Sequence, residues 1–357
     1  MQWGLLVATG IVFGLGAVLL VKLGNPGNYG FCAACQLRDI AGALGIHQVQ
    51  LLQYVRPEIL GWVIGAFAIS RVRGEFNPRG GSNPGVRFFL GMVMMLGALV
   101  FLGCPLRAIL RLAGGDLNGI TALAGFAGGI WLGIYFLKNG YNLGRARNIE
   151  NTAALAGYLP VILAVFLLGA VALNASFLNF SAKGPGSMHA PLAASFLIAL
   201  LAGVMAQRVR MCLSGGLRDY LLVKDTDLLK VYGIMFLTAL AANAYFGFLK
   251  IGFEAQPLAH TMHVWNFMGL FLVGLAATLA GGCPLRQLIM AGEGNVDALA
   301  CVLGMLAGAG VAHGLNLAGS AAGVSINGQI AVVMGIVLTS GIGIFCREKV
   351  TLIEEGA

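Results

Sequence analysis

The sequence has few charged residues: Asp, Glu, Lys and Arg make up 10% of its 357 residues, whereas soluble domains carry about 25%. This scarcity excludes an ordinary soluble domain, which needs a charged surface. Acidic residues are the scarcer kind, 14 against 22 Lys and Arg, so the formal net charge is +8. In so apolar a chain, we attribute the basic excess to the cytoplasmic face of a membrane rather than to nucleic-acid binding.

Several functional signatures are also missing from the sequence. It contains no Walker phosphate loop, no flavin or nicotinamide fingerprint and no Ser-His-Asp arrangement. These absences argue against a common type of enzyme, and against an ATP-driven pump unless a partner supplies the motor. Cys32-x-x-Cys35 has no second Cys-x-x-Cys with which to form a tetrahedral zinc site. We therefore expect no metal and no cofactor.

Apolar residues and glycine are abundant. The chain is 58% hydrophobic, contains 54 glycines and has a mean hydropathy of +0.86. Glycine is tolerated in transmembrane helices because it lets helix backbones approach closely. The opening Met1-Gln2-Trp3 lacks the basic start of a cleavable signal peptide, so we expect the first apolar run to remain as a span. The fold class is an all-α polytopic membrane protein.

Hydropathy places ten spans of roughly 17–25 residues along the chain, five in each half. They are 4–22, 55–71, 88–103, 118–137, 158–175, 190–207, 229–249, 264–281, 297–317 and 329–346. Four segments between spans are too short or too polar to cross. We interpret these segments as re-entrant helices that meet centrally, as in an hourglass; they are 30–48, 104–116, 212–227 and 283–296.

The four short segments carry a repeated cysteine-arginine element. The elements are Cys32–Asp39, Cys104–Arg107, Cys212–Asp219 and Cys283–Arg286, and the halves are offset by 180 and 179 positions. The chain is therefore a duplication, with repeats at 1–178 and 179–357. An odd number of spans per repeat gives the two repeats opposite orientations. Inverted repeats are typical of transporters whose substrate site lies where the repeats meet.

The positive charges orient the repeats. With the N-terminus in the cytoplasm, 15 of the 22 Lys and Arg fall on the cytoplasmic side, which favours two cytoplasmic termini. They are Arg71, Arg73, Arg79, Arg87, Lys138, Arg145, Arg147, Arg208, Arg210, Arg218, Lys224, Lys230, Arg286, Arg347 and Lys349. Cys32 and Cys104 then enter from the opposite side, and Cys212 and Cys283 from the cytoplasmic side.

The elements suit a small anion with a soft atom. Proline after Cys104 and Cys283 favours a helix start with the cysteine at the N-cap. A helix N-terminus attracts anions, arginine adds a cation, and a thiol is a soft contact. The candidate pathway residues are Cys32, Cys104, Cys212, Cys283, Arg38, Arg107, Arg218 and Arg286.

Some side chains have less certain roles in this scheme. Asp39 and Asp219 are suited to neutralise or orient the preceding arginines, and Cys35 has only Gly215 as its counterpart. A single Cys-Pro-Leu-Arg is better explained by packing and helix initiation, but four symmetric elements are not. Cys301 and Cys346 have no symmetric partner, so we interpret them as packing residues.

These duplicated elements, in a Gly-rich polytopic chain, resemble the YeeE/YedE family of sulfur-compound transport proteins. The segment Phe31–Asp39 is most similar to the selenium-associated YedE branch. The resemblance implies an hourglass in which Cys32, Cys104 and Cys283 pass thiosulfate through S–H contacts without lasting covalent bonds. Cys212 is added by internal symmetry. The resemblance also implies a cytoplasmic sulfurtransferase-like acceptor as a partner.

We therefore expect a multi-pass protein of the bacterial inner membrane that transports a small sulfur- or selenium-containing anion, with no nucleic-acid partner. Two other classes stay open. One is a membrane thiol protein that exchanges electrons or a persulfide through Cys32 and Cys35. The other is a partner or sensor subunit that does not itself transport. A water or ammonium channel fits the cysteines and arginines less well.

Overall fold

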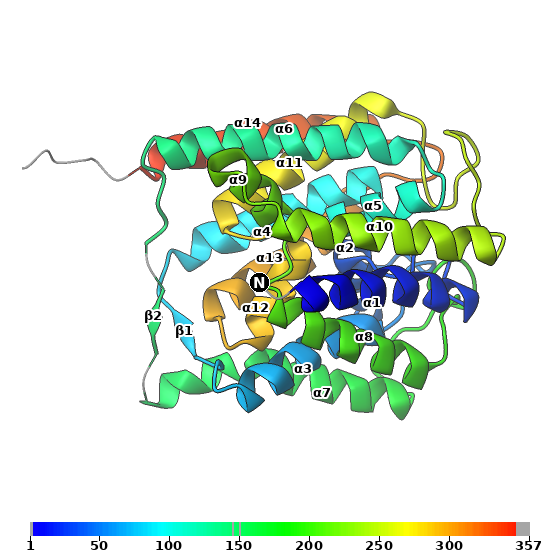
Figure 1. Cartoon of the computed structure of the whole chain (residues 1–357), viewed down its shortest axis with the longest axis horizontal. Helices are drawn as coiled ribbons and strands as arrows, with labels where there is room; N and C mark the ends of the chain where they lie inside the picture. The colour runs from blue at the N-terminus through cyan, green and yellow to red at the C-terminus, as the bar shows by residue number, and fades with distance from the viewer. Residues whose placement is uncertain (1–2, 145, 150, 348–357) are drawn as a thin grey trace, which may run out of the picture.

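The computed structural model describes residues 3–144, 146–149 and 151–347, and this part of the chain is almost entirely helical (Figure 1). Arg145 and Lys349, which contribute to the predicted charge bias, lie outside the described residues. In chain order the elements are α1 (Trp3–Lys22), α2 (Ala33–Ala43), α3 (Pro57–Val72), β1 (Arg79–Gly80), α4 (Pro84–Phe101), α5 (Pro105–Ala113), α6 (Asn118–Lys138), β2 (Arg147–Asn148), η1 (Asn151–Gly157), α7 (Leu159–Ala172), α8 (Leu192–Arg208), α9 (Leu213–Val223), α10 (Asp227–Tyr245), α11 (His263–Ala280), α12 (Pro284–Gly292), α13 (Val296–Gly314) and α14 (Ile326–Phe345).

Each of the ten predicted spans coincides with one of the longer helices, and the prediction of an all-α polytopic membrane protein is confirmed. Among the described residues, eight helical segments are long and apolar enough to cross a membrane. The predicted spans at 55–71 and 158–175 form the shorter helices α3, of 16 residues, and α7, of 14 residues. Many side chains on the outer helices are apolar and exposed, including Trp131, Leu197 and Val337, as expected of a surface that meets lipid.

The four predicted short segments form the helices α2, α5, α9 and α12, which have 9 to 11 residues each. At about 1.5 Å per residue, none is long enough to cross a hydrocarbon core of about 30 Å. Proline at the first position starts α5 and α12, because its missing N–H would be unpaired there anyway. α2, α5 and α12 are almost entirely buried, whereas α9 is buried only near its start and is exposed over its last turn.

The two halves repeat the same order and the same packing. α1 packs on α10 and its counterpart α8 packs on α3, while α6 packs on α11 and its counterpart α13 packs on α4. A Cβ on Gly125 would strike the backbone of Phe267, and one on Gly304 would strike the backbone of Phe88. Glycine is therefore required at two equivalent crossings. The symmetry fails at the last helix of each half, since α7 packs on α3 whereas α14 packs on α11 and α4.

The first helices of the two halves, α1 and α8, pack against each other in opposite directions. Gly16 of α1 faces Ile198 of α8, whereas Gly24, after α1, faces His189, before α8; the two helices are therefore antiparallel. The loop from residue 173 to 191 joins the halves and contains the predicted boundary between residues 178 and 179.

The loops collect at the two ends of the bundle, with the helices running between them (Figure 1). One end holds β1 and β2, the Arg208–Glu75 ion pair and the start of α9. The other end holds the 44–56, 173–191, 246–262 and 315–325 connections. α9 and α12 lie toward the first end and α2 and α5 toward the second, so each half contributes its short helices from one end.

Candidate functional site

Each short helix begins directly after the cysteine of its element. Cys32, Cys104, Cys212 and Cys283 occupy the N-cap positions of α2, α5, α9 and α12, with extended backbone. The predicted N-cap role of Cys104 and Cys283 is confirmed. None of the four thiols is in a disulfide. The cysteines therefore lie beside the unpaired N–H groups and partial positive charge of four helix N-termini.

The first-half cysteines form one buried group. The Cys32 sulfur accepts the N–H of Cys35 at 3.4 Å and the N–H of Cys104 at 3.5 Å. The Cys104 thiol lies within hydrogen-bonding reach of the Cys32 thiol and of the backbone at Ala34 and Arg107. The N-termini of α2 and α5 therefore converge on the same thiols.

The second-half cysteines form an equivalent group. The Cys212 sulfur accepts the N–H of Gly215 at 3.3 Å and lies 3.1 Å from the Ser214 hydroxyl. Its thiol is also within hydrogen-bonding reach of the Cys283 thiol. All four N-cap cysteines are buried, and the most exposed is Cys212 at 6%.

Two cavities approach these groups from opposite ends of the bundle. One, of about 490 Å³, is lined by Cys212, Arg218 and Arg286 together with loop residues such as Arg208. The other, of about 420 Å³, is lined by Arg38, Arg107 and His313, but by none of the cysteines. The thiol groups therefore lie between two basic cavities.

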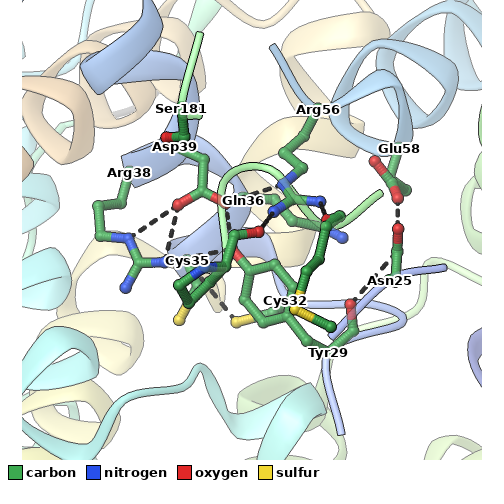
Figure 2. Close-up of polar contacts among 12 residues, drawn as sticks. Asn25, Tyr29, Cys32, Cys35, Gln36, Arg38, Asp39, Arg56, Glu58 and Ser181 are labelled. Carbon is green, nitrogen blue, oxygen red and sulfur yellow. Dashed lines mark hydrogen bonds and ion pairs between the residues drawn. The ribbon is translucent and has the colours of Figure 1, made fainter. Parts of the chain in front are cut away.

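The first-half cavity is backed by a buried ionic network (Figure 2). Asp39 accepts from Arg38 at 2.7 and 3.0 Å and from Arg56 at 2.8 Å. The Tyr29 hydroxyl donates to the same carboxylate at 2.8 Å. Arg56 is fully buried and also donates to the backbone carbonyls of Pro185 and Met188. The predicted neutralisation of Arg38 by Asp39 is present, and one carboxylate serves two guanidinium groups.

Arg107 is the exception among the buried arginines. It is 1% exposed, and among the described residues no carboxylate lies within ion-pair distance of it. Its guanidinium donates to the Asn28 carbonyl at 2.8 Å, to the Leu102 carbonyl and to the Cys35 sulfur at 3.5 Å. One terminal nitrogen, Nη2, is buried without a partner. A buried, uncompensated cation is costly, and its environment suits an incoming anion.

The second-half arginines are paired. Arg286 donates to the Glu293 carboxylate through its two terminal nitrogens, Nη1 and Nη2, at 2.9 and 3.3 Å. Arg218 pairs with Asp219 at 2.9 Å, with both side chains about one-third exposed. The predicted pairing of Arg218 with Asp219 is therefore present, whereas Glu293 was not predicted as a partner of Arg286.

Sequence reasoning missed several other parts of the site. Arg56, Glu58 and Tyr29 join the network through contacts between separate segments, such as the 2.7 Å bond from Asn25 to Glu58.

The helices, the two cavities and the buried thiols define a polytopic membrane protein with a candidate path for an anion. Residues 208–346 match the family model described as Sulphur transport. This match lies in the second half of the chain and agrees with the resemblance to the YeeE/YedE proteins that the duplicated elements indicate.

Two curated relatives match part of the chain. It is 33% identical over 102 residues to the thiosulfate transporter TsuA of Spirochaeta thermophila, a stretch that is 29% of this chain and 30% of the relative. It is 27% identical over 109 residues to the thiosulfate transporter TsuA of Escherichia coli, which is 30% of each chain. The matched stretch thus spans less than a third of either relative.

Proposed function

We propose that this protein transports a small anion containing sulfur or selenium across the bacterial inner membrane. The observation that carries the proposal is Arg107, a buried guanidinium that lacks a carboxylate and has one unpartnered nitrogen. It lines a cavity and donates to the Cys35 sulfur. An anion that enters this cavity would supply the missing negative charge within reach of thiols.

The transported class follows from the groups that meet the anion. The thiols of Cys32, Cys104, Cys212 and Cys283 are soft, polarizable contacts, and each lies at a helix N-terminus. Thiosulfate and selenium analogues carry a soft atom that sulfate lacks. Conduction needs several weak sites in series rather than one strong site. We infer that the anion passes from the Cys32–Cys104 group to the Cys212–Cys283 group.

The antiparallel packing of α1 and α8 supports an inverted repeat. We place both termini in the cytoplasm, so that the cavity at Arg107 faces outward and the cavity at Cys212 faces inward. A cytoplasmic sulfurtransferase-like acceptor that consumes the anion would keep the flux directed. These assignments belong to the proposal together with the selenium-associated branch.

The first test is uptake of radiolabelled thiosulfate and selenite into proteoliposomes. We expect flux by the wild type, and loss of most flux in Cys104→Ala and Cys283→Ala. Cys301→Ala is the matched control, because Cys301 is equally buried but lies within α13. Flux by all three variants at the wild-type rate would refute the thiol path. Excess sulfate that competes as well as thiosulfate would refute the proposed selectivity.

A second candidate function is thiol redox or persulfide exchange. The observation in its favour is that the Cys32 and Cys35 thiols lie within hydrogen-bonding reach of each other. This candidate predicts a disulfide that forms and breaks during turnover and loss of function in Cys35→Ser. The transport proposal predicts that Cys35→Ser retains more activity than Cys104→Ala.

A further inference from the structure

His313, the second-to-last residue of α13, carries a ring nitrogen that the fold leaves without a hydrogen-bond partner. Its Nε2 atom is buried and makes no hydrogen bond with any described residue. Most buried polar side-chain atoms have a partner, because leaving such a group unpaired costs about 1–3 kcal/mol. The unpaired nitrogen of His313 therefore requires an explanation.

The place of this residue indicates what it could bind. His313 lines the cavity of about 420 Å³ together with Arg107 and Arg38. Arg107 keeps Nη2 without a partner, and Arg38 meets Asp39 through Nε and Nη2, which leaves its Nη1 outside that ion pair. Three side chains with unused nitrogens, from α2, α5 and α13, thus line a single cavity.

A second histidine holds the His313 ring in place. The rings of His47 and His313 pack with their centroids 4.6 Å apart. The N–H of Val49 donates to Nδ1 of His47 at 3.3 Å, so the His47 proton lies on Nε2, which donates to the Arg38 carbonyl at 3.0 Å. Both nitrogens of His47 are thus used by the backbone beside Arg38. Of the two stacked histidines, His313 is the one with a nitrogen left for a ligand.

We propose that His313 is a specificity-determining residue that binds the anion in this cavity together with Arg107, by donating a ring N–H to an oxygen of the anion. The inference rests on the proposed function and deepens it, because it adds a residue to the site of capture. Histidine donates an N–H in its neutral form as well, so it needs no third positive charge. Weak contacts of this kind allow release. Among the described residues that line the cavity at Cys212 there is no histidine, so this donor distinguishes the two cavities.

The test is equilibrium binding of radiolabelled thiosulfate to the purified full-length protein, followed by uptake into proteoliposomes. His313→Phe keeps a ring against His47 and removes both nitrogens, whereas His313→Gln keeps an N–H donor. We expect His313→Phe to raise Kd and KM about tenfold, the effect of one lost hydrogen bond, with little change in Tm. His313→Gln should recover most of this loss. His263→Phe is the control and should keep the wild-type Kd, because His263 is exposed and is not among the described residues that line either cavity.

The outcomes separate this inference from the proposed function. Wild-type uptake with an unchanged Kd in His313→Phe would overturn the inference and leave transport in place. Equal weakening of binding in His313→Phe and His313→Gln, with a fall in Tm, would assign His313 a packing role and also overturn it. If the wild type binds thiosulfate without transporting it, the proposed function fails, and the Kd values still decide the role of His313. A wild type that binds neither thiosulfate nor selenite would overturn both.

Discussion

The two Cys-Pro-Leu-Arg elements are identical in sequence, but their arginines are neutralised differently. Arg286 forms a two-nitrogen ion pair with Glu293, seven residues later. The residue seven positions after Arg107 is Gly114, where a Cβ would contact the Asn28 side chain. Arg107 therefore donates to carbonyl oxygens and a sulfur instead of a carboxylate. The same motif thus yields a compensated cation beside one cavity and an uncompensated cation beside the other.

The aspartates of the two halves differ in the opposite sense. Asp39 is fully buried and binds two arginines, whereas Asp219 is about one-third exposed and binds one. The first half thus combines a buried ion-pair network at Asp39 with an arginine, Arg107, that has no carboxylate partner among the described residues. In the second half both arginines have a carboxylate partner, and the Arg218–Asp219 pair is partly exposed. Under the proposed function, this contrast predicts that the anion is captured at Arg107 and released past Arg286.

The largest expected effect is on stability. Asp39→Asn would leave Arg38 and Arg56 buried without their carboxylate, and breaking a buried pair costs about 3–5 kcal/mol. The equivalent change, Asp219→Asn, should cost less than about 1 kcal/mol, because its pair is partly exposed. The measurement is thermal unfolding in detergent. Equal shifts in Tm for the two variants would show that the Asp39 ion pairs stabilise the fold no more than the Asp219 ion pair.

The next effect is on substrate capture. Arg107→Gln should raise the KM for thiosulfate roughly 10- to 100-fold, since hydrogen bonds to charged groups contribute about 1.5–3 kcal/mol. The matched control is the double variant Arg286→Gln/Glu293→Gln, which removes a neutral pair and should change KM less. Uptake kinetics in proteoliposomes measure both. A larger change in the double variant would reverse the assignment of capture and release.

The third expected effect is smaller and concerns release of the anion past Arg286. Glu293→Gln would free the Arg286 guanidinium and create a second uncompensated cation, so we expect tighter thiosulfate binding and slower turnover, each by about tenfold. Arg79, 3.6 Å from Glu293, is exposed and should adjust. Equilibrium binding to purified protein together with uptake rates gives the two numbers. Unchanged binding would show that Arg286 does not meet the anion.

The smallest expected effect concerns Arg218, which is partly exposed in the cavity at Cys212. Arg218→Gln should lower uptake only a few-fold at low salt and have almost no effect at 1 M salt, where the Debye length falls to about 3 Å. The comparison is Arg107→Gln, whose loss should persist at both salt concentrations because the site is buried. A salt-independent loss in Arg218→Gln would instead place Arg218 at a binding site.

Much of the fold was predictable because two physical signals are strong in this sequence. Long apolar runs identified the ten longer helices, and the repeated elements located the four short helices and their N-caps. The site was predictable only where contacts are local, as between Arg38 and Asp39. The contacts of Asp39 with Arg56, and of Asn25 with Glu58, join segments that hydropathy does not relate. The lack of compensation at Arg107 was also out of reach, since it depends on which carboxylates fold near it.

The paired crossings at Gly125 and Gly304 have a consequence for how the protein works. Helix backbones in direct contact at two symmetric points cannot slide or rock past one another without losing that contact. We therefore expect the long helices to stay fixed relative to one another, with motion confined to side chains and the short helices. Cross-linking α6 to α11 near Gly125 should therefore leave transport running, which distinguishes a static cage from a rocking pair of domains.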